Sequence, residues 1–202
     1  MPNQSQKSSN LATPNYILWE YFICLSEQVK SVSELTDKKD IQRKVLLCVF
    51  LSIAIVETFL NVYFRQLAEE SGFKSHRDQT LKELVEIVPL DLKIKVWPRR
   101  FFGNGLDFSC GIGQRFMALK KLRNNLMHFK SSYEAIDVPG VRIQGVADVT
   151  SYETLDKNVA MESLHVAEGI IQKIFRLKGM NAEDIQGALH IWIGSLPVAE
   201  IK

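Results

Sequence analysis

The sequence is short of the features that mark secreted and metal-binding proteins. Its 202 residues include only three cysteines, Cys24, Cys48 and Cys110. Three widely spaced cysteines supply neither a disulfide framework nor a four-cysteine zinc site. Apolar residues flank Cys24 and Cys48 in the sequence, so these cysteines are expected to be small core residues. Free cysteines favour a reducing compartment and a cytoplasmic location.

Long apolar runs are lacking too. The most apolar stretch, residues 45–56, has about twelve residues, whereas a helix needs roughly 20 to span a bilayer. We therefore expect a buried core helix there and no association with a membrane. Residues 1–13 are polar and lack the basic start and apolar centre of a signal peptide, so they are predicted to form a disordered tail.

A surplus of charge of one sign is also missing. The chain has 25 Lys and Arg against 23 Asp and Glu, a net charge of +2. Any binding of nucleic acid must therefore come from local clustering of basic residues. His76, His165 and His190 lie far apart in the sequence and indicate no metal site, and we expect no cofactor.

What the sequence does contain is helical periodicity. Its 46% hydrophobic and 24% charged residues are ordinary for a globular protein, and residues 14–202 are predicted to form a single domain. Apolar residues recur at three- and four-residue steps, which predicts an all-α bundle of about five or six helices. The second helix is apolar almost all round and is expected to be central. The predicted helices span residues 14–35, 37–72, 80–89, 113–131, 156–179 and 181–194. Their starts are expected from the side chains that cap or begin a helix, namely Thr13, Asp37, a capping box of Thr80 and Glu83, Asp156 and Asn181.

Two segments break this pattern. Residues 91–111 carry three glycines, one proline and several aromatic residues, which predicts an irregular connection. Its aromatic side chains either cover an open edge of the core or belong to a functional loop. Residues 132–154 are rich in Val and Ile around a Pro139-Gly140 turn, so a small β-hairpin could be inserted between the fourth and fifth helices.

The fourth predicted helix carries the most informative motif, Arg123-Asn124-Asn125-Leu126-Met127-His128. At about 100° per residue, His128 falls nearly opposite the apolar stripe of this helix, with Asn124 one turn before it on the same face. Arg123 lies at the edge of the stripe, splayed from His128 by roughly 140°. Either a curled Arg123 side chain or a second protomer would be needed to complete one site.

An arginine, a polar residue, three further residues and a histidine on a late bundle helix resemble the signature of HEPN domains. The second helix strengthens the resemblance, because residues 55–61 are similar to the HEPN helix that carries an acidic residue facing the arginine. That residue is Glu57 here. The resemblance covers roughly residues 16–178, with the irregular segment and the hairpin as insertions.

The resemblance implies a metal-independent endoribonuclease in which the ribose 2′-hydroxyl attacks the adjacent phosphate and leaves a cyclic phosphate. His128 would move the proton, since histidine titrates near neutrality. Arg123 would stabilise the phosphate charge with its fork of donors, and Asn124 would orient either the histidine or the phosphate. Glu57 would hold Arg123, and Asn61 would either support the site or form a helix–helix hydrogen bond.

The same resemblance implies RNA as substrate, a homodimer, and a toxin or defence role with an antitoxin or other protein partner. Lys120, Lys121 and Arg115 would bind the RNA backbone, although a solvated face also explains such residues. The alternative is a catalytically inactive HEPN-like bundle that binds a protein or RNA, because fold does not fix function. Under either hypothesis Glu57, a charge in an apolar helix, is expected to form a salt bridge with Arg123.

Overall fold

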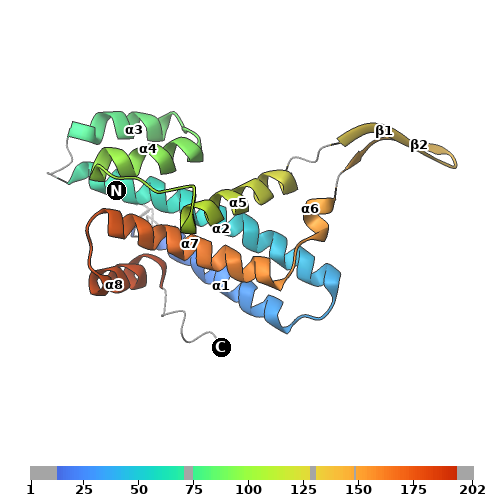
Figure 1. Ribbon diagram of the computed structural model, residues 1–202, viewed down its shortest axis with the longest axis horizontal. Helices are drawn as coiled ribbons and strands as arrows, with labels where there is room; N and C mark the ends of the chain where they lie inside the picture. Colours follow the sequence, from blue (N-terminus) through green and yellow to red (C-terminus); the bar gives the residue numbers. More distant parts are fainter. Residues whose placement is uncertain (1–12, 71–74, 128–130, 148, 195–202) are drawn as a thin grey trace, which may run out of the picture.

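The computed structural model describes residues 13–70, 75–127, 131–147 and 149–194, and for residues 131–136, 138 and 143–147 it describes the backbone only. Within these residues the chain is an all-α bundle, as predicted (Figure 1). Its elements are α1 (Tyr16–Glu34), α2 (Lys38–Glu69), α3 (Arg77–Val85), α4 (Leu90–Phe102), α5 (Gly111–Met127), β1 (Ser131–Val138), β2 (Val141–Ala147), α6 (Thr150–Glu153), α7 (Lys157–Leu177) and α8 (Ala182–Ile193).

The central element is α2, as its apolar circumference predicted. It packs against α1, α3, α4, α5, α6 and α7, and Val45, Ile55, Phe59 and Leu67 are completely buried. Over an 18-residue window α2 has a mean hydropathy of 2.4, and half of that window is buried. By length and composition alone such a helix could also cross a bilayer. Burial beneath α1 and α7 accounts for the same composition in a core helix.

Three helices begin at the capping residues that the sequence predicts. The side chains of Asp37, Asp156 and Asn181 accept hydrogen bonds from backbone N–H groups of the first turns of α2, α7 and α8, at 2.9, 3.0 and 2.9 Å. Each bond satisfies a donor that a helix start leaves without a partner. The predicted cap at Thr13 was wrong, because α1 begins at Tyr16 and no side chain caps it.

The prediction of an irregular segment from residue 91 to residue 111 was wrong for its first part, which forms α4. The helix buries a stripe spaced four, three and four residues apart, made of Leu90, Ile94, Trp97 and Phe101. Pro98 lies inside the helix, where it removes one backbone hydrogen bond. Burial of the aromatic residues on either side of it offsets that loss.

α4 ends one residue before Gly103, which adopts a left-handed conformation with φ 75°. Its N–H donates to the carbonyl of Arg99 at 2.9 Å. Glycine takes this conformation without the steric cost that a side chain would add.

The capping box predicted at Thr80 and Glu83 was also wrong, because α3 begins at Arg77 and both residues lie inside it. Glu83 instead accepts two hydrogen bonds from the Arg100 guanidinium, at 2.7 and 2.8 Å, and one from Trp97 Nε1 at 2.6 Å. The side chains of Arg100 and Glu83 are only 11% and 13% exposed. Hydrogen bonds from Arg100 first, and then from Trp97, lower the pKa of Glu83. This buried pair fastens α3 to α4.

β1 and β2 lie in the segment for which the sequence left a hairpin open, between α5 and α6. They pair as antiparallel strands, with Ile136 opposite Ile143 and Val138 opposite Val141. Figure 1 shows the two strands extending away from the helices. Val141, near the turn, is 59% exposed.

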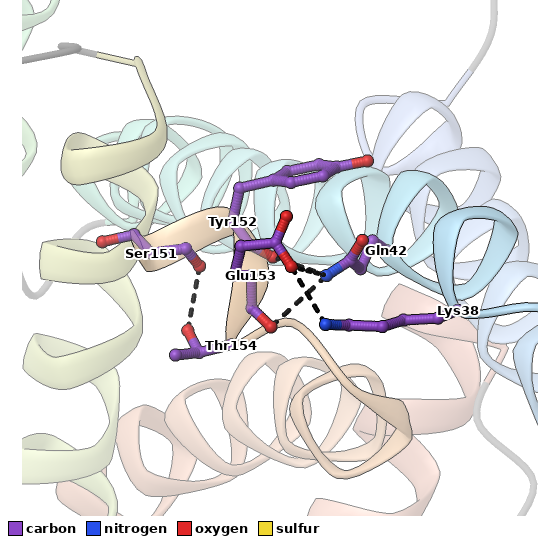
Figure 2. Close-up of polar contacts among 6 residues, drawn as sticks. All are labelled: Lys38, Gln42, Ser151, Tyr152, Glu153 and Thr154. Carbon is purple, nitrogen blue, oxygen red and sulfur yellow. Dashed lines mark hydrogen bonds and ion pairs between the residues drawn. The ribbon is translucent and has the colours of Figure 1, made fainter. Parts of the chain in front are cut away.

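The short helix α6 anchors the base of these strands to α2 (Figure 2). Gln42 of α2 is 2% exposed, and its Nε2 donates to the backbone carbonyls of Tyr152 and Glu153 at 3.3 Å each. Lys38 forms an ion pair with the Glu153 carboxylate at 2.9 Å. The hydrogen bonds from Lys38 and Gln42 lower the pKa of Glu153.

The cysteines differ from one another in environment. Cys48 is completely buried in α2, and burial raises the pKa of its thiol to about 12. The expectation that Cys24 is a core residue was wrong, since it is exposed. The buried stripe of α1 runs through Phe22 and Leu25, and Cys24 falls on the outer side of that stripe.

We expect Glu83→Gln to lower the free energy of unfolding by about 3 kcal/mol at pH 7, because it leaves the Arg100 charge buried without a carboxylate. The folded-state pKa of Glu83 is lowered, so its stabilisation is fully present above the ordinary glutamate pKa of about 4.3 and is lost as pH falls through the folded pKa. The deficit of the variant relative to wild type should therefore shrink in acid. Urea unfolding between pH 7 and pH 3 measures both effects.

Glu86→Gln is the matched control for this prediction. Glu86 lies in the same region and pairs with Lys82 at 3.7 Å, but these side chains are 55% and 71% exposed. Its loss should cost less than about 1 kcal/mol at any pH. Equal costs for the two variants would contradict the assigned role of Glu83.

Candidate functional site

The predicted motif borders a pocket enclosed by α2, the start of α4 and α5. The pocket has a volume of about 270 Å³. Four of its polar side chains carry charge, and they come from three different helices. The lining residues are Ile53, Glu57, Pro89, Leu90, Asp91, Lys120, Arg123 and Asn124.

Arg123 and Asn124 enter this pocket from α5. Both side chains are partly buried, and Arg123 Nη1 donates to Asn124 Oδ1 at 3.1 Å. The buried stripe of α5 includes Phe116, Leu119 and Leu126. Its packing fixes the direction in which Arg123 and Asn124 point. The amide of Asn124 therefore orients the Arg123 guanidinium. The resemblance had implied instead that Asn124 orients the histidine or the phosphate.

The predicted salt bridge between Glu57 and Arg123 was wrong. Glu57 Oε1 lies 3.0 Å from Nζ of Lys93, and no ion pair joins Glu57 to Arg123 among the residues that the structure describes. The physical reason is that the Lys93 side chain is only 2% exposed and its ammonium needs a carboxylate. The same ammonium lies 5.9 Å from the centre of the Trp97 ring. Glu57 nevertheless lines the same pocket as Arg123.

A second lysine forms an ion pair with the other carboxylate of the pocket. Lys120 Nζ lies 2.6 Å from Asp91 Oδ2, with side chains 17% and 43% exposed. Asp91 Oδ1 is buried and accepts no hydrogen bond from any described residue. Lys120 was predicted to bind RNA, and the structure places it at the pocket but already paired with an acid.

The other predicted site residues lie elsewhere. Arg115 forms a bidentate ion pair with Glu162 of α7, in which Arg115 Nε lies 2.6 Å from the carboxylate, and it lines a different pocket, between α5 and α7. Lys121 is exposed on α5. Asn61 follows Glu57 by one turn of α2 but lines a separate cavity against α3.

The third predicted catalytic residue, His128, lies outside the described residues, and so do Phe129 and Lys130. α5 ends at Met127, directly before them, and Met127 is 45% exposed. The role expected of His128 therefore stays a prediction.

Sequence reasoning missed Lys93 and Asp91, because it had treated their segment as irregular. The spacing that predicts a helix was present in the sequence, since one face of the helix is marked by Leu90, Ile94, Trp97 and Phe101. Lys93 falls beside that stripe, and a lysine at a buried position needs an acid as partner. Glu57, a lone acid in an apolar helix, has the same need.

Comparisons of the chain with models of known families, with curated proteins and with solved structures find no match.

We expect Lys93→Met to release Glu57, which then pairs with Arg123, the cation of the same pocket that forms no ion pair with a described acid. The variant should lose about 1 to 3 kcal/mol of unfolding free energy, and the loss in the double variant with Glu57→Gln should be smaller than the sum of the two single losses. Denaturant unfolding of the two single variants and the double variant measures the coupling. A crystal structure of Lys93→Met should show Glu57 and Arg123 within 4 Å, the ordinary limit of a salt bridge.

Lys95→Met is the control, because Lys95 belongs to the same helix and is exposed. It should leave stability within about 0.5 kcal/mol of wild type. A Lys93→Met protein as stable as the control, with no coupling to Glu57, would show that the pair contributes nothing to the pocket.

Proposed function

We propose that the protein is a metal-independent endoribonuclease of HEPN type, with Arg123, Asn124 and His128 as its catalytic residues. One observation carries the proposal. Lysines pair with both carboxylates of the motif pocket, and among the described residues the Arg123 guanidinium is held by the Asn124 amide and forms no ion pair with an acid. An arginine in this state keeps its charge available for a phosphate oxygen.

The charges around the pocket support an anionic ligand. Glu57 and Asp91 are balanced by Lys93 and Lys120, and this leaves the positive charge of Arg123 in excess. An arginine already oriented by Asn124 loses little conformational freedom when it binds phosphate. Partial burial also strengthens its interaction with charge that builds up in a transition state.

The proposed reaction is attack of the ribose 2′-hydroxyl oxygen on the adjacent phosphorus. A P–O bond forms, the bond to the 5′-oxygen breaks, and the products are a 2′,3′-cyclic phosphate and a 5′-hydroxyl. His128 transfers a proton in this step, and Arg123 stabilises the negative charge on the phosphate oxygens. Asn124 acts through Arg123 and is therefore a positioning residue.

The proposal includes a homodimer, in which the ends of two α5 helices meet. The splay of roughly 140° between Arg123 and His128 along one helix favours a site completed by two chains. The exposed Met127 offers an apolar contact between these two residues. RNA is the proposed ligand, and an antitoxin is the proposed protein partner under a toxin role.

We expect the wild-type protein to cleave a mixed RNA substrate in the presence of EDTA. Arg123→Ala and His128→Ala should each lower the rate by about 10²–10⁴. The products of wild type should end in a cyclic phosphate, which mass spectrometry detects. His128→Ala should keep the wild-type melting temperature, because the predicted outward position of His128 adds little to the core.

Arg43→Ala is the matched control for Arg123, since Arg43 is a 68% exposed arginine of α2 paired with Asp40. It should cleave like wild type. Cleavage that survives in His128→Ala or disappears with EDTA would exclude this mechanism. A wild-type protein that binds RNA without cutting it would instead favour an inactive RNA-binding bundle.

For the homodimer, sedimentation equilibrium at micromolar concentration should give about twice the chain mass of 23.0 kDa. Met127→Glu should shift the protein toward monomer, because it places a charge in the proposed contact. Leu47→Glu, an exposed leucine of α2, is the control and should remain dimeric. A wild-type protein that sediments as a monomer would contradict the dimer but not the chemistry at Arg123.

A further inference from the structure

A cavity of about 900 Å³ lies between α2 and α3, away from the motif pocket. Its volume falls within the range typical of small-molecule binding sites, about 300–1,000 Å³. Neither the motif nor the proposed cleavage reaction uses it. Its two walls differ in chemistry, which restricts the kind of ligand that would fit.

The wall formed by α3 is apolar. Leu81, Leu84 and Val85 line the cavity, and Val85 is 82% exposed at its rim. Ile87, two residues beyond, is 79% exposed and has a positive φ of 52°, which a β-branched residue rarely adopts. Exposed apolar side chains beside a concave surface are typical of a binding site for an apolar group.

The wall formed by α2 is polar, and its polar side chains differ in whether a partner pairs with them. Asn61, Arg65 and Glu69 follow one another at single-turn spacing and share one face of the helix. Glu69 is paired with Arg77 at 3.2 Å. Among the described residues no ion pair engages Arg65. Arg65 is therefore the charge of this wall that is available to a ligand.

The side-chain amide of Asn61, in the same wall, has a buried acceptor atom. Its Oδ1 is buried and accepts no hydrogen bond from any described residue. A buried acceptor without a donor lowers stability by the cost of its lost hydration. Such a cost in a cavity wall indicates that a ligand supplies the donor.

The apolar wall is held rigidly in place. Glu83 of α3, on the turn between Leu81 and Leu84, forms the buried pair with Arg100 and Trp97 of α4. The two walls therefore belong to elements fixed to the same core, and the cavity is preformed. A preformed site spends less binding energy on ordering itself.

We infer that this cavity binds an amphipathic organic anion. The apolar body of the ligand packs against Leu81, Leu84 and Val85, its anionic group pairs with Arg65, and an N–H or O–H group of the ligand donates to Asn61 Oδ1. The inference is independent of the proposed ribonuclease activity, because Arg123 lies at another pocket.

The test uses the full chain and two probes that share an aromatic body and an N–H donor. The first, 1-anilinonaphthalene-8-sulfonate, carries an anionic group, whereas N-phenyl-1-naphthylamine does not. Wild type should bind one equivalent of the sulfonate probe with a rise in fluorescence. Arg65→Gln should weaken binding of the sulfonate probe about tenfold and leave binding of the neutral probe unchanged.

Asn61→Leu gives a second and independent readout. It should weaken binding of both probes about fivefold, because both donate to Oδ1. In the absence of probe it should raise the melting temperature by about 2 to 4 °C, since it removes a buried acceptor that has no donor. A residue with a purely structural role would not combine higher stability with weaker binding.

Arg43→Gln, on the exposed part of α2, is the control and should change neither affinity nor melting temperature. Equal binding of the sulfonate probe by wild type, Asn61→Leu and Arg65→Gln would place the probe elsewhere and overturn the inference. An absence of saturable binding by wild type would overturn it as well. Neither of these results depends on whether the protein cuts RNA.

Discussion

The need to enclose α2 determines the arrangement of the other helices. A 32-residue helix with apolar side chains on nearly every face can be buried only if helices pack on several sides of it. α1 and α7 cover two of these sides, and α5 packs between α2 and α7. The orientation of α5 follows from that packing, and with it the direction in which Arg123 and Asn124 point. The site is therefore a consequence of the core.

Charges buried in this core impose a second constraint. Lys93 and Glu83 each lie where water cannot solvate them fully, so each requires an opposite charge from another helix. Lys93 joins α4 to α2 through Glu57, and Glu83 joins α3 to α4 through Arg100. Apolar packing alone would allow α3 and α4 to slide along α2. These two pairs fix their register, and both pockets of α2 depend on that register.

The elements that could be predicted from the sequence were those with a local physical signal. Asp37, Asp156 and Asn181 cap their own helices, so the starts of α2, α7 and α8 are encoded within a few residues. α4 escaped prediction because Pro98 and the glycines after it suggested a loop. The apolar stripe of α4 was present in the sequence, but the burial of Trp97 and its hydrogen bond to Glu83, which offset the effect of Pro98, are tertiary contacts that a local pattern does not record.

The same distinction applies to the candidate site. The motif on α5 could be found from spacing, and burial of Phe116, Leu119 and Leu126 bears out the apolar stripe. Asn124, which was expected opposite that stripe, instead lines the pocket with Arg123. The partner of Glu57 could not be chosen by the same reasoning, because Arg123 and Lys93 were equally able to neutralise it. The decision depends on which cation is more deeply buried, and this is a property of α4. Its outcome changes the chemistry, since a guanidinium held by an amide retains charge that a carboxylate would have neutralised.

Glu57 and Asn61 show how one helix can line two separate cavities. They are separated by a single turn of α2, yet one lines the pocket beside α5 and the other lines the cavity beside α3. The division arises because α4, carrying Lys93, packs against α2 and holds the Glu57 side chain toward the first pocket. Asn61, one turn further along, meets α3 and finds no donor there. A change that loosens α4 would therefore disturb both sites, whereas a change confined to Arg65 or to Arg123 would affect only one, because residues without shared partners act additively.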